Sequence, residues 1–180
     1  MYCSGVRAPP RWRDHPARAE LVALYAEAEA LTRACTCACT LATTPDDALC
    51  CRFGATGREP YPTPVELCEV DHALRARGAH SRSTGASSSS KRRALPLAKD
   101  PDACPLLSPE GRCTIYESRP FGCRTFFCHG HEPPRRDRET IQRIGRRIAD
   151  LAARFFPRDS LPRPFTRALR APLPAVPPVV

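Results

Sequence analysis

Apolar residues recur at helical spacing in three stretches of the chain. In the first stretch they return every three or four positions, at Leu21, Leu24, Tyr25, Ala28 and Leu31. Residues three and four apart lie on one face of a helix, so this period predicts a helix over 16–33. Asp14 can cap this helix, and Pro16 is tolerated in its first turn.

The second stretch has a clear start signal. Thr63 precedes Pro64, and Glu66 follows three residues after the threonine, which is the pattern of a capping box. The apolar residues that follow share one face: Leu67, Val70 and Leu74. Gly78 is placed to end the helix in a left-handed conformation. These signals predict a helix over 64–77.

The third stretch predicts a helix over 137–155, which Pro157 ends. Its apolar residues lie on one face: Ile141, Ile144, Ile148, Leu151 and Phe155. Alternating apolar and polar runs are too few for a large sheet. We therefore expect a small, mainly α-helical or irregular domain, with about three helices around two cysteine-rich loops.

The remaining segments divide the chain by composition. Residues 1–13 predict an irregular N-terminus, and residues 14–156 predict one domain. Within this domain, residues 78–93 are rich in serine and predict a flexible linker. Residues 157–180 contain seven prolines and predict a disordered tail.

Cysteine is the residue that suggests chemistry. The chain has eleven cysteines in 180 residues, an odd number that disulfides within one chain cannot use completely. Most of them fall into two groups: Cys35, Cys37, Cys39, Cys50 and Cys51, then Cys104, Cys113, Cys123 and Cys128. The N-terminus has no apolar segment typical of a secretory signal, and no run reaches 18 apolar residues. We therefore expect a cytoplasmic protein without a membrane segment, whose dense cysteines bind metal rather than form disulfides.

The second cysteine group lies among turn residues. Eight, nine and four residues separate its successive cysteines, and prolines and glycines stand between them. Such turns can bring four thiolates to about 2.3 Å from a zinc ion. Arg119 and Arg124 would support the ligands, because positive neighbours offset thiolate charge and favour the ionised thiol. The spacings match neither a zinc finger nor a ferredoxin, so zinc and iron both remain candidates.

Four motifs in this region support a family resemblance: Cys104-Pro105-Leu106-Leu107, Cys113-Thr114-Ile115-Tyr116, Arg119-Pro120 and Cys123-Arg124-Thr125-Phe126. With the Cys50-Cys51 pair upstream, they resemble the YkgJ family of cysteine-cluster proteins, which are described as zinc- or iron-chelating domains. The resemblance covers about residues 35–130. It implies chelation of zinc or of an iron–sulfur cluster, without a defined enzymatic activity.

The expected metal ligands come from both groups: Cys37, Cys39, Cys50, Cys51, Cys104, Cys113, Cys123 and Cys128. About ten residues separate Cys39 from Cys50 where the family has two, so Cys35 stays an alternative to Cys37 and Cys39. His129 and His131 are further alternatives, because imidazole can replace a thiolate. Cys68 follows an apolar residue on a predicted helix and is expected in the core.

Three functions fit the sequence. The first is a metal-binding protein that carries zinc or iron. The second is an iron–sulfur redox enzyme or accessory protein, although no acid–base constellation marks an active site, so enzymatic activity is undecided. The third is a zinc-stapled nucleic-acid-binding protein. The net charge of the chain is +9, and residues 133–180 carry eleven arginines against four acidic residues. This basic segment could contact phosphates, but an Arg-rich composition alone can also produce a basic helix face. The sequence identifies no protein partner.

Overall fold

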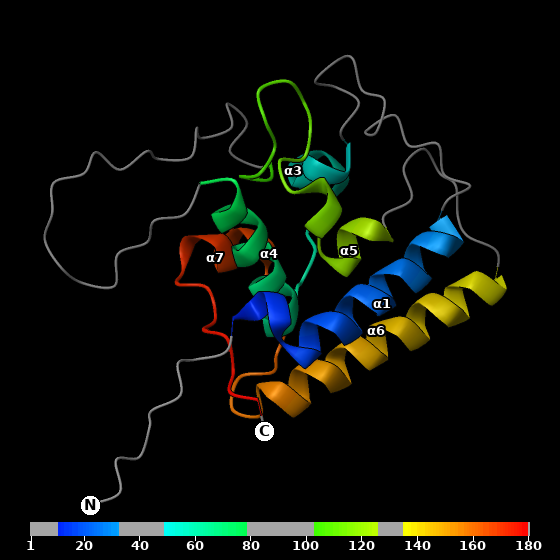
Figure 1. Ribbon diagram of the computed structural model, residues 1–180. Helices are drawn as coiled ribbons and strands as arrows, with labels where there is room; N and C mark the ends of the chain where they lie inside the picture. Colours follow the sequence, from blue (N-terminus) through cyan, green and yellow to red (C-terminus); the bar gives the residue numbers. More distant parts are fainter. Residues whose placement is uncertain (1–10, 33–48, 79–102, 126–134, 180) are drawn as a thin grey trace, which may run out of the picture.

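The computed structural model of the protein describes residues 11–32, 49–78, 103–125 and 135–179 (Figure 1). Its α-helices are α1 (Pro16–Thr32), α3 (Phe53–Thr56), α4 (Pro64–Ala76), α5 (Phe121–Arg124), α6 (Arg135–Phe155) and α7 (Phe165–Arg170). Three 3-10 helices accompany them: η1 (Trp12–Asp14), η3 (Leu49–Cys51) and η4 (Tyr116–Ser118). Within these residues, β-structure is limited to isolated bridges, which confirms the mainly helical class.

The three helices predicted from the sequence are α1, α4 and α6, and α6 begins two residues earlier than expected. The capping box of α4 is confirmed, since the backbone N–H of Thr63 donates to Glu66 Oε2 at 2.8 Å. Gly78 follows the helix with a φ of 67°, in the left-handed conformation that favours glycine.

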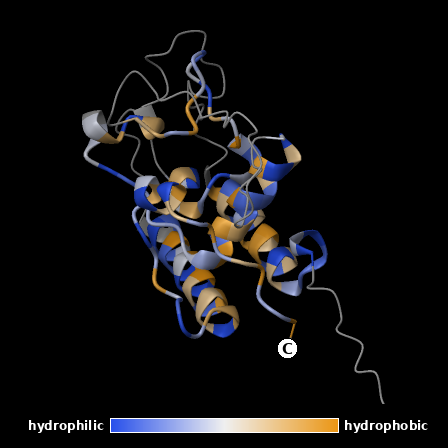
Figure 2. Cartoon of the chain, turned by 90° about the vertical axis from the view of Figure 1, so that its left-hand side faces the viewer, coloured by the Kyte–Doolittle hydropathy of each residue, from blue (hydrophilic) through white to orange (hydrophobic). Residues whose placement is uncertain are grey.

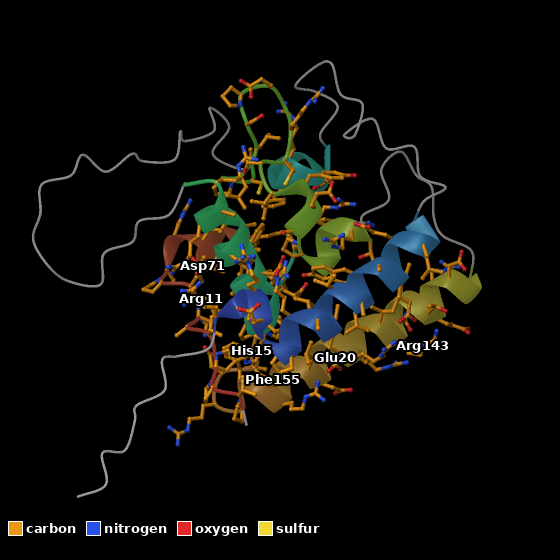
Figure 3. All side chains as sticks on the ribbon, viewed as in Figure 1. Arg11, His15, Glu20, Asp71, Arg143 and Phe155 are labelled. Atoms are coloured by element: carbon orange, nitrogen blue, oxygen red, sulfur yellow. The ribbon has the colours of Figure 1, made fainter. Side chains whose placement is uncertain are left out.

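The start of α1 differs from the sequence prediction. Asp14 lies in η1, and the cap is His15, whose Nδ1 accepts from the backbone N–H of Ala17 at 3.2 Å. The His15 ring is buried between Trp12 and Phe155, with ring centroids 5.5 and 5.1 Å away (Figure 3). Packing of the imidazole therefore decides which residue caps the helix.

Helices α1 and α6 lie side by side and antiparallel (Figure 1). Their apolar faces meet α4 in a first core, where the largest fully buried side chains are Leu21, Leu24, Ile144, Ile148, Leu151 and Val65. Figure 2 shows that the apolar positions of these helices turn toward the interior. This core fixes the helical body from which the cysteine-bearing loops extend.

A second core contains or contacts the described cysteines at positions 50, 51, 104 and 113. Its side chains come from α4, the loop after Ala103, and α7: Leu67, Val70, Leu74, Leu106, Ile115, Phe165 and Leu169. Cys51 and Cys104 belong to the same buried cluster. The cysteine region is thus attached to the body by apolar packing and not only by chain connection.

The structure corrects the prediction of a disordered tail over 157–180. In the described part, residues 157–179, the chain returns along the molecule and forms α7. Phe165 is 1% exposed, its backbone N–H donates to Pro60 at 3.0 Å, and that of Thr166 donates to Glu59 at 2.6 Å. Apolar residues between the prolines are buried in the second core and hold this segment in place. A count of prolines does not reveal this burial.

Candidate metal centre

Three separate segments bring cysteines together. Cys50 and Cys51 end η3, and the backbone N–H of Cys104 donates to the carbonyl of Cys51 at 2.7 Å. An isolated antiparallel bridge between Arg52 and Ala103 continues this pairing. Backbone hydrogen bonds therefore join the first cysteine group to the second, although about fifty residues separate them in sequence.

The loop from Cys104 to Cys113 folds back on itself. Leu107 pairs with Cys113 in an antiparallel bridge, and the N–H of Thr114 donates to the carbonyl of Leu106 at 2.9 Å. The loop reverses at Gly111, whose φ of 75° is unfavourable for residues with a side chain. This reversal returns Cys113 to the neighbourhood of Cys104.

Cys123 comes from α5, which begins after Pro120. The preceding residue, Gly122, packs against Pro60, and a Cβ added to Gly122 would lie only 3.0 Å from the Pro60 Cβ. The absence of a side chain therefore lets α5 approach the Pro60 segment. Such close packing holds Cys123 beside the other cysteines.

The thiols interact with one another. The Sγ atoms of Cys50 and Cys51 lie 3.9 Å apart. Hydrogen bonds of the Cys51 thiol with Cys104, Cys113 and Cys50 raise its pKa. The pKa of Cys113 is lowered, because its sulfur accepts a hydrogen bond from Cys51 and, to a smaller extent, is favoured by the charge of Arg119. Cys113 is therefore the thiol that ionises more readily of this pair.

Burial raises the pKa of Cys123, and the neighbouring Cys104 and Cys113 raise it further. Ionising several of these thiols together is unfavourable, because like charges would be buried close to one another. A bound cation removes that penalty, since a coordinated thiol is deprotonated outright. The cluster thus has the electrostatics of a site that needs a positive ion to become a set of thiolates.

Arg124 and Arg119 order the chain around the cluster. The Arg124 guanidinium is buried, donates to the carbonyls of Arg119 and Glu117, pairs with Glu29, and lies 4.0 Å from the Tyr25 ring centroid. Arg119 donates to the carbonyl of Tyr116 at 2.9 Å. Both arginines therefore hold loop carbonyls in place, and Arg119 also places positive charge near Cys113.

Two buried carboxylates, which sequence reasoning did not assign to the site, hold it to α4. Glu66 Oε1 accepts from the N–H of Phe121 at 2.7 Å, at the start of the helix that carries Cys123. Burial raises the pKa of Glu66, and the hydrogen bonds from Thr63 and Phe121 oppose this shift. Glu69 accepts from Trp12 at 2.8 Å and from Ser118 at 3.1 Å. The sequence did carry one signal for this role. Glu66 and Glu69 lie three residues apart, on one side of the predicted helix and among its apolar residues.

The described candidates therefore divide clearly. Cys50, Cys51, Cys104, Cys113 and Cys123 lie together, whereas Cys68 is buried in the first core, as predicted. The other candidates lie outside the described residues: Cys35, Cys37, Cys39, Cys128, His129 and His131. Among residues 11–32, 49–78, 103–125 and 135–179, no three His, Cys, Asp or Glu side chains form a ready-made metal-holding arrangement. The donors are thus adjacent and suited to zinc or iron by their all-sulfur chemistry, but not in coordinating geometry.

A groove borders the cysteine cluster. It has a volume of about 920 Å³ and is partly open to solvent. Its lining includes Cys50, Cys123, Arg58, Glu59, Tyr61 and Arg170. Cys51 and Cys104, by contrast, do not line it and are buried, with 7% and 3% exposure. The groove is therefore a solvent-accessible approach to the cluster.

The nucleic-acid alternative would use the basic helix α6. Arg147 pairs with Glu27 of α1 at 2.6 Å, and Arg154 pairs with Glu20. Arg143 lies 3.8 Å from the same Glu27, and Figure 3 shows Glu20 and Arg143 along the paired helices. Carboxylates of α1 thus neutralise part of the positive face of α6.

No family model, curated protein or solved structure matches the chain. The resemblance to the YkgJ family consequently depends on the motif residues alone. None of the helices in the described segments has the length and apolar character to cross a lipid bilayer.

Proposed function

We propose that this protein binds zinc or an iron–sulfur cluster through cysteine thiolates drawn from both cysteine groups. The observation that supports it is the meeting of five cysteines from three segments, at residues 50–51, 104–113 and 123. Cys51 interacts with Cys50, Cys104 and Cys113. Cys123 interacts through charge with Cys104 and Cys113. All-sulfur donor sets suit zinc and iron–sulfur clusters better than magnesium or calcium.

Cys37, Cys39 and Cys128 would complete the ligand set, as the family resemblance implies. Arg119 and Arg124 would position the loops that carry the ligands. Free thiols suit a reducing, cytoplasmic compartment, and the described cysteines include five of them: Cys51, Cys68, Cys104, Cys113 and Cys123. A bound metal would supply charge neutralisation and a cross-link between the segments, while these residues orient and shield it.

The test is purification without oxygen, followed by elemental analysis and a visible spectrum. Stoichiometric zinc in a colourless protein, or iron with acid-labile sulfide and absorption at about 400 nm, would support the proposal. Chelation should unfold the cysteine region, because metal binding can contribute about 10 kcal/mol to folding. A folded protein that contains neither metal and has all thiols free would overturn it.

Single variants separate ligands from core cysteines. Cys113→Ser should reduce the metal content, because serine replaces a sulfur donor by a weaker neutral oxygen. Cys68→Ala is the matched control, since the Cys68 thiol is 2% exposed in the first core and should leave the metal content unchanged. Equal metal loss in both variants would indicate unfolding rather than loss of a ligand.

A further inference from the structure

The short helix α5 is attached to the helical body on both sides of the candidate ligand Cys123. Two residues before Cys123, the backbone N–H of Phe121 donates to Glu66 Oε1 of α4 at 2.7 Å. One residue after Cys123, the buried guanidinium group of Arg124 pairs with Glu29 of α1. Because α5 has only four residues, these two attachments fix the backbone that carries the Cys123 thiol.

Tyr25 of α1 contacts both attachments. Its hydroxyl donates to Glu66 Oε1 at 3.3 Å, and this is the same oxygen that accepts from Phe121. The centroid of its ring lies 4.0 Å from the guanidinium carbon of Arg124. Tyr25 is 3% exposed, and α1 contacts both α4 and α5 (Figure 1). One side chain of the helical body thus meets both the residue that holds the start of α5 and the residue that anchors its end.

The hydrogen bonds of Glu66 explain why the Tyr25 hydroxyl matters. Glu66 is 3% exposed, and its Oε2 accepts from the backbone N–H and from the hydroxyl of Thr63. A buried carboxylate is unfavourable unless donors surround it, so loss of the Tyr25 hydroxyl would remove one of the donors that keep Glu66 in position. Burial and, after it, the charge of Glu66 raise the pKa of Tyr25, so the hydroxyl keeps the proton that it donates.

We propose that Tyr25 is a positioning residue for the metal ligand Cys123, which it holds in place through Glu66 and Arg124. This inference rests on the proposed metal-binding function and assigns a role in it to a residue outside both cysteine groups. Without the hydroxyl, α5 gains conformational freedom, and the chain must lose this freedom again when Cys123 binds metal. Residues that orient metal ligands commonly change metal affinity by about 10- to 100-fold.

The experiment compares four full-length chains in a double-mutant cycle: the unmodified chain, Tyr25→Phe, Cys123→Ser and the double variant. Zinc affinity is measured without oxygen, by competition with a chromophoric chelator. Tyr25→Phe keeps the ring beside Arg124 and removes only the hydroxyl, and it should weaken zinc binding about tenfold. Cys123→Ser should also weaken zinc binding. Adding Tyr25→Phe to that chain should change the affinity by less than about twofold, because the ligand through which Tyr25 acts is already lost.

Ile148→Val is the matched control, since it removes one buried methylene of α6 from the first core and no hydrogen-bonding group. It should lower stability slightly and leave the zinc affinity unchanged. An unchanged affinity in Tyr25→Phe, or an equal loss with and without Cys123, would overturn this inference, because a general loss of stability does not depend on that thiol. Zinc binding that Cys123→Ser leaves unaffected would also overturn it. A chain that binds no zinc would overturn this inference as well, and the proposed function falls with it only if iron is also absent.

Discussion

At the residue scale, two buried side chains, Arg124 and Cys68, stabilise the fold in different ways. Arg124 is a charged residue with 5% exposure, and its guanidinium group donates hydrogen bonds to two backbone carbonyls and to Glu29. Cys68 is a cysteine outside the cluster, and its thiol contacts the carbonyl of Pro174 at 3.7 Å. Each role predicts a different consequence of substitution.

Arg124→Ala should lower the free energy of unfolding by about 2–3 kcal/mol, because two loop carbonyls lose a charged donor and Glu29 loses its partner. The measurement is urea unfolding of the metal-loaded protein. Arg147→Ala is the control, since its pair with Glu27 is exposed and should contribute under about 1 kcal/mol. Similar losses in the two variants would contradict the role of Arg124.

Cys68→Ala tests a pH dependence. Burial raises the pKa of Cys68 from 9.0 to about 12, so the folded protein holds this proton more tightly than the unfolded chain. The contribution of the thiol to stability is therefore complete below pH 9 and is lost as the pH rises toward 12.

The variant should cost about 1 kcal/mol at pH 8, from the lost volume in the core. Its disadvantage should shrink as the pH rises above 9. The free energies of unfolding of both proteins, measured from pH 8 to pH 11, check this. Curves that stay parallel over this range would show that Cys68 titrates normally.

At the element scale, α1 serves two purposes. Its apolar face packs on α6, and its glutamates pair with the arginines of α6. These ion pairs lower the net positive charge on the face of α6 that lies beside α1. The same arrangement predicts how a nucleic-acid-binding face could be exposed.

Glu20→Gln with Glu27→Gln should increase the affinity for arbitrary duplex DNA and steepen its dependence on salt by about one to two ions. Fluorescence anisotropy at 50–200 mM salt measures both quantities. Asp71→Asn with Asp159→Asn gives the same change in net charge away from α6 and is the control. Strong binding by the unmodified protein at 150 mM salt would instead favour the nucleic-acid function.

At the scale of the whole molecule, the C-terminal segment closes the second core. Phe165, Ala168 and Leu169 of α7 share that core with Cys51 and Cys104. Glu59 joins α7 to the groove lining through Thr166. The stability of the segment and the geometry of the candidate centre should therefore be coupled.

Phe165→Ala should destabilise the protein by about 3–4 kcal/mol and should lower metal retention during dialysis against a weak chelator. Thermal unfolding and elemental analysis measure these effects. Leu161→Ala is the control, because its side chain is 74% exposed and its loss should change stability by under about 0.5 kcal/mol. A neutral Phe165→Ala variant would mean that α7 does not hold the core together.

The sequence by itself determined the elements whose signals are local. Helical periodicity and the Thr63–Glu66 capping box located α1, α4 and α6, and turn residues located the loops that carry the second cysteine group. Cys68 was predicted correctly as a core residue, because its helical neighbours define a buried face. These features depend on residues within a few positions of one another, so a pattern can reveal them.

Only the tertiary structure decided which distant residues meet. The pairing of Cys51 with Cys104, the hydrogen bond from Phe121 to Glu66, and the return of α7 onto the second core all join segments far apart in sequence. His15 replaced Asp14 as the cap of α1 because Trp12 and Phe155 enclose its ring. Burial and long-range hydrogen bonds depend on how the complete chain packs. Composition and local spacing therefore do not predict them directly.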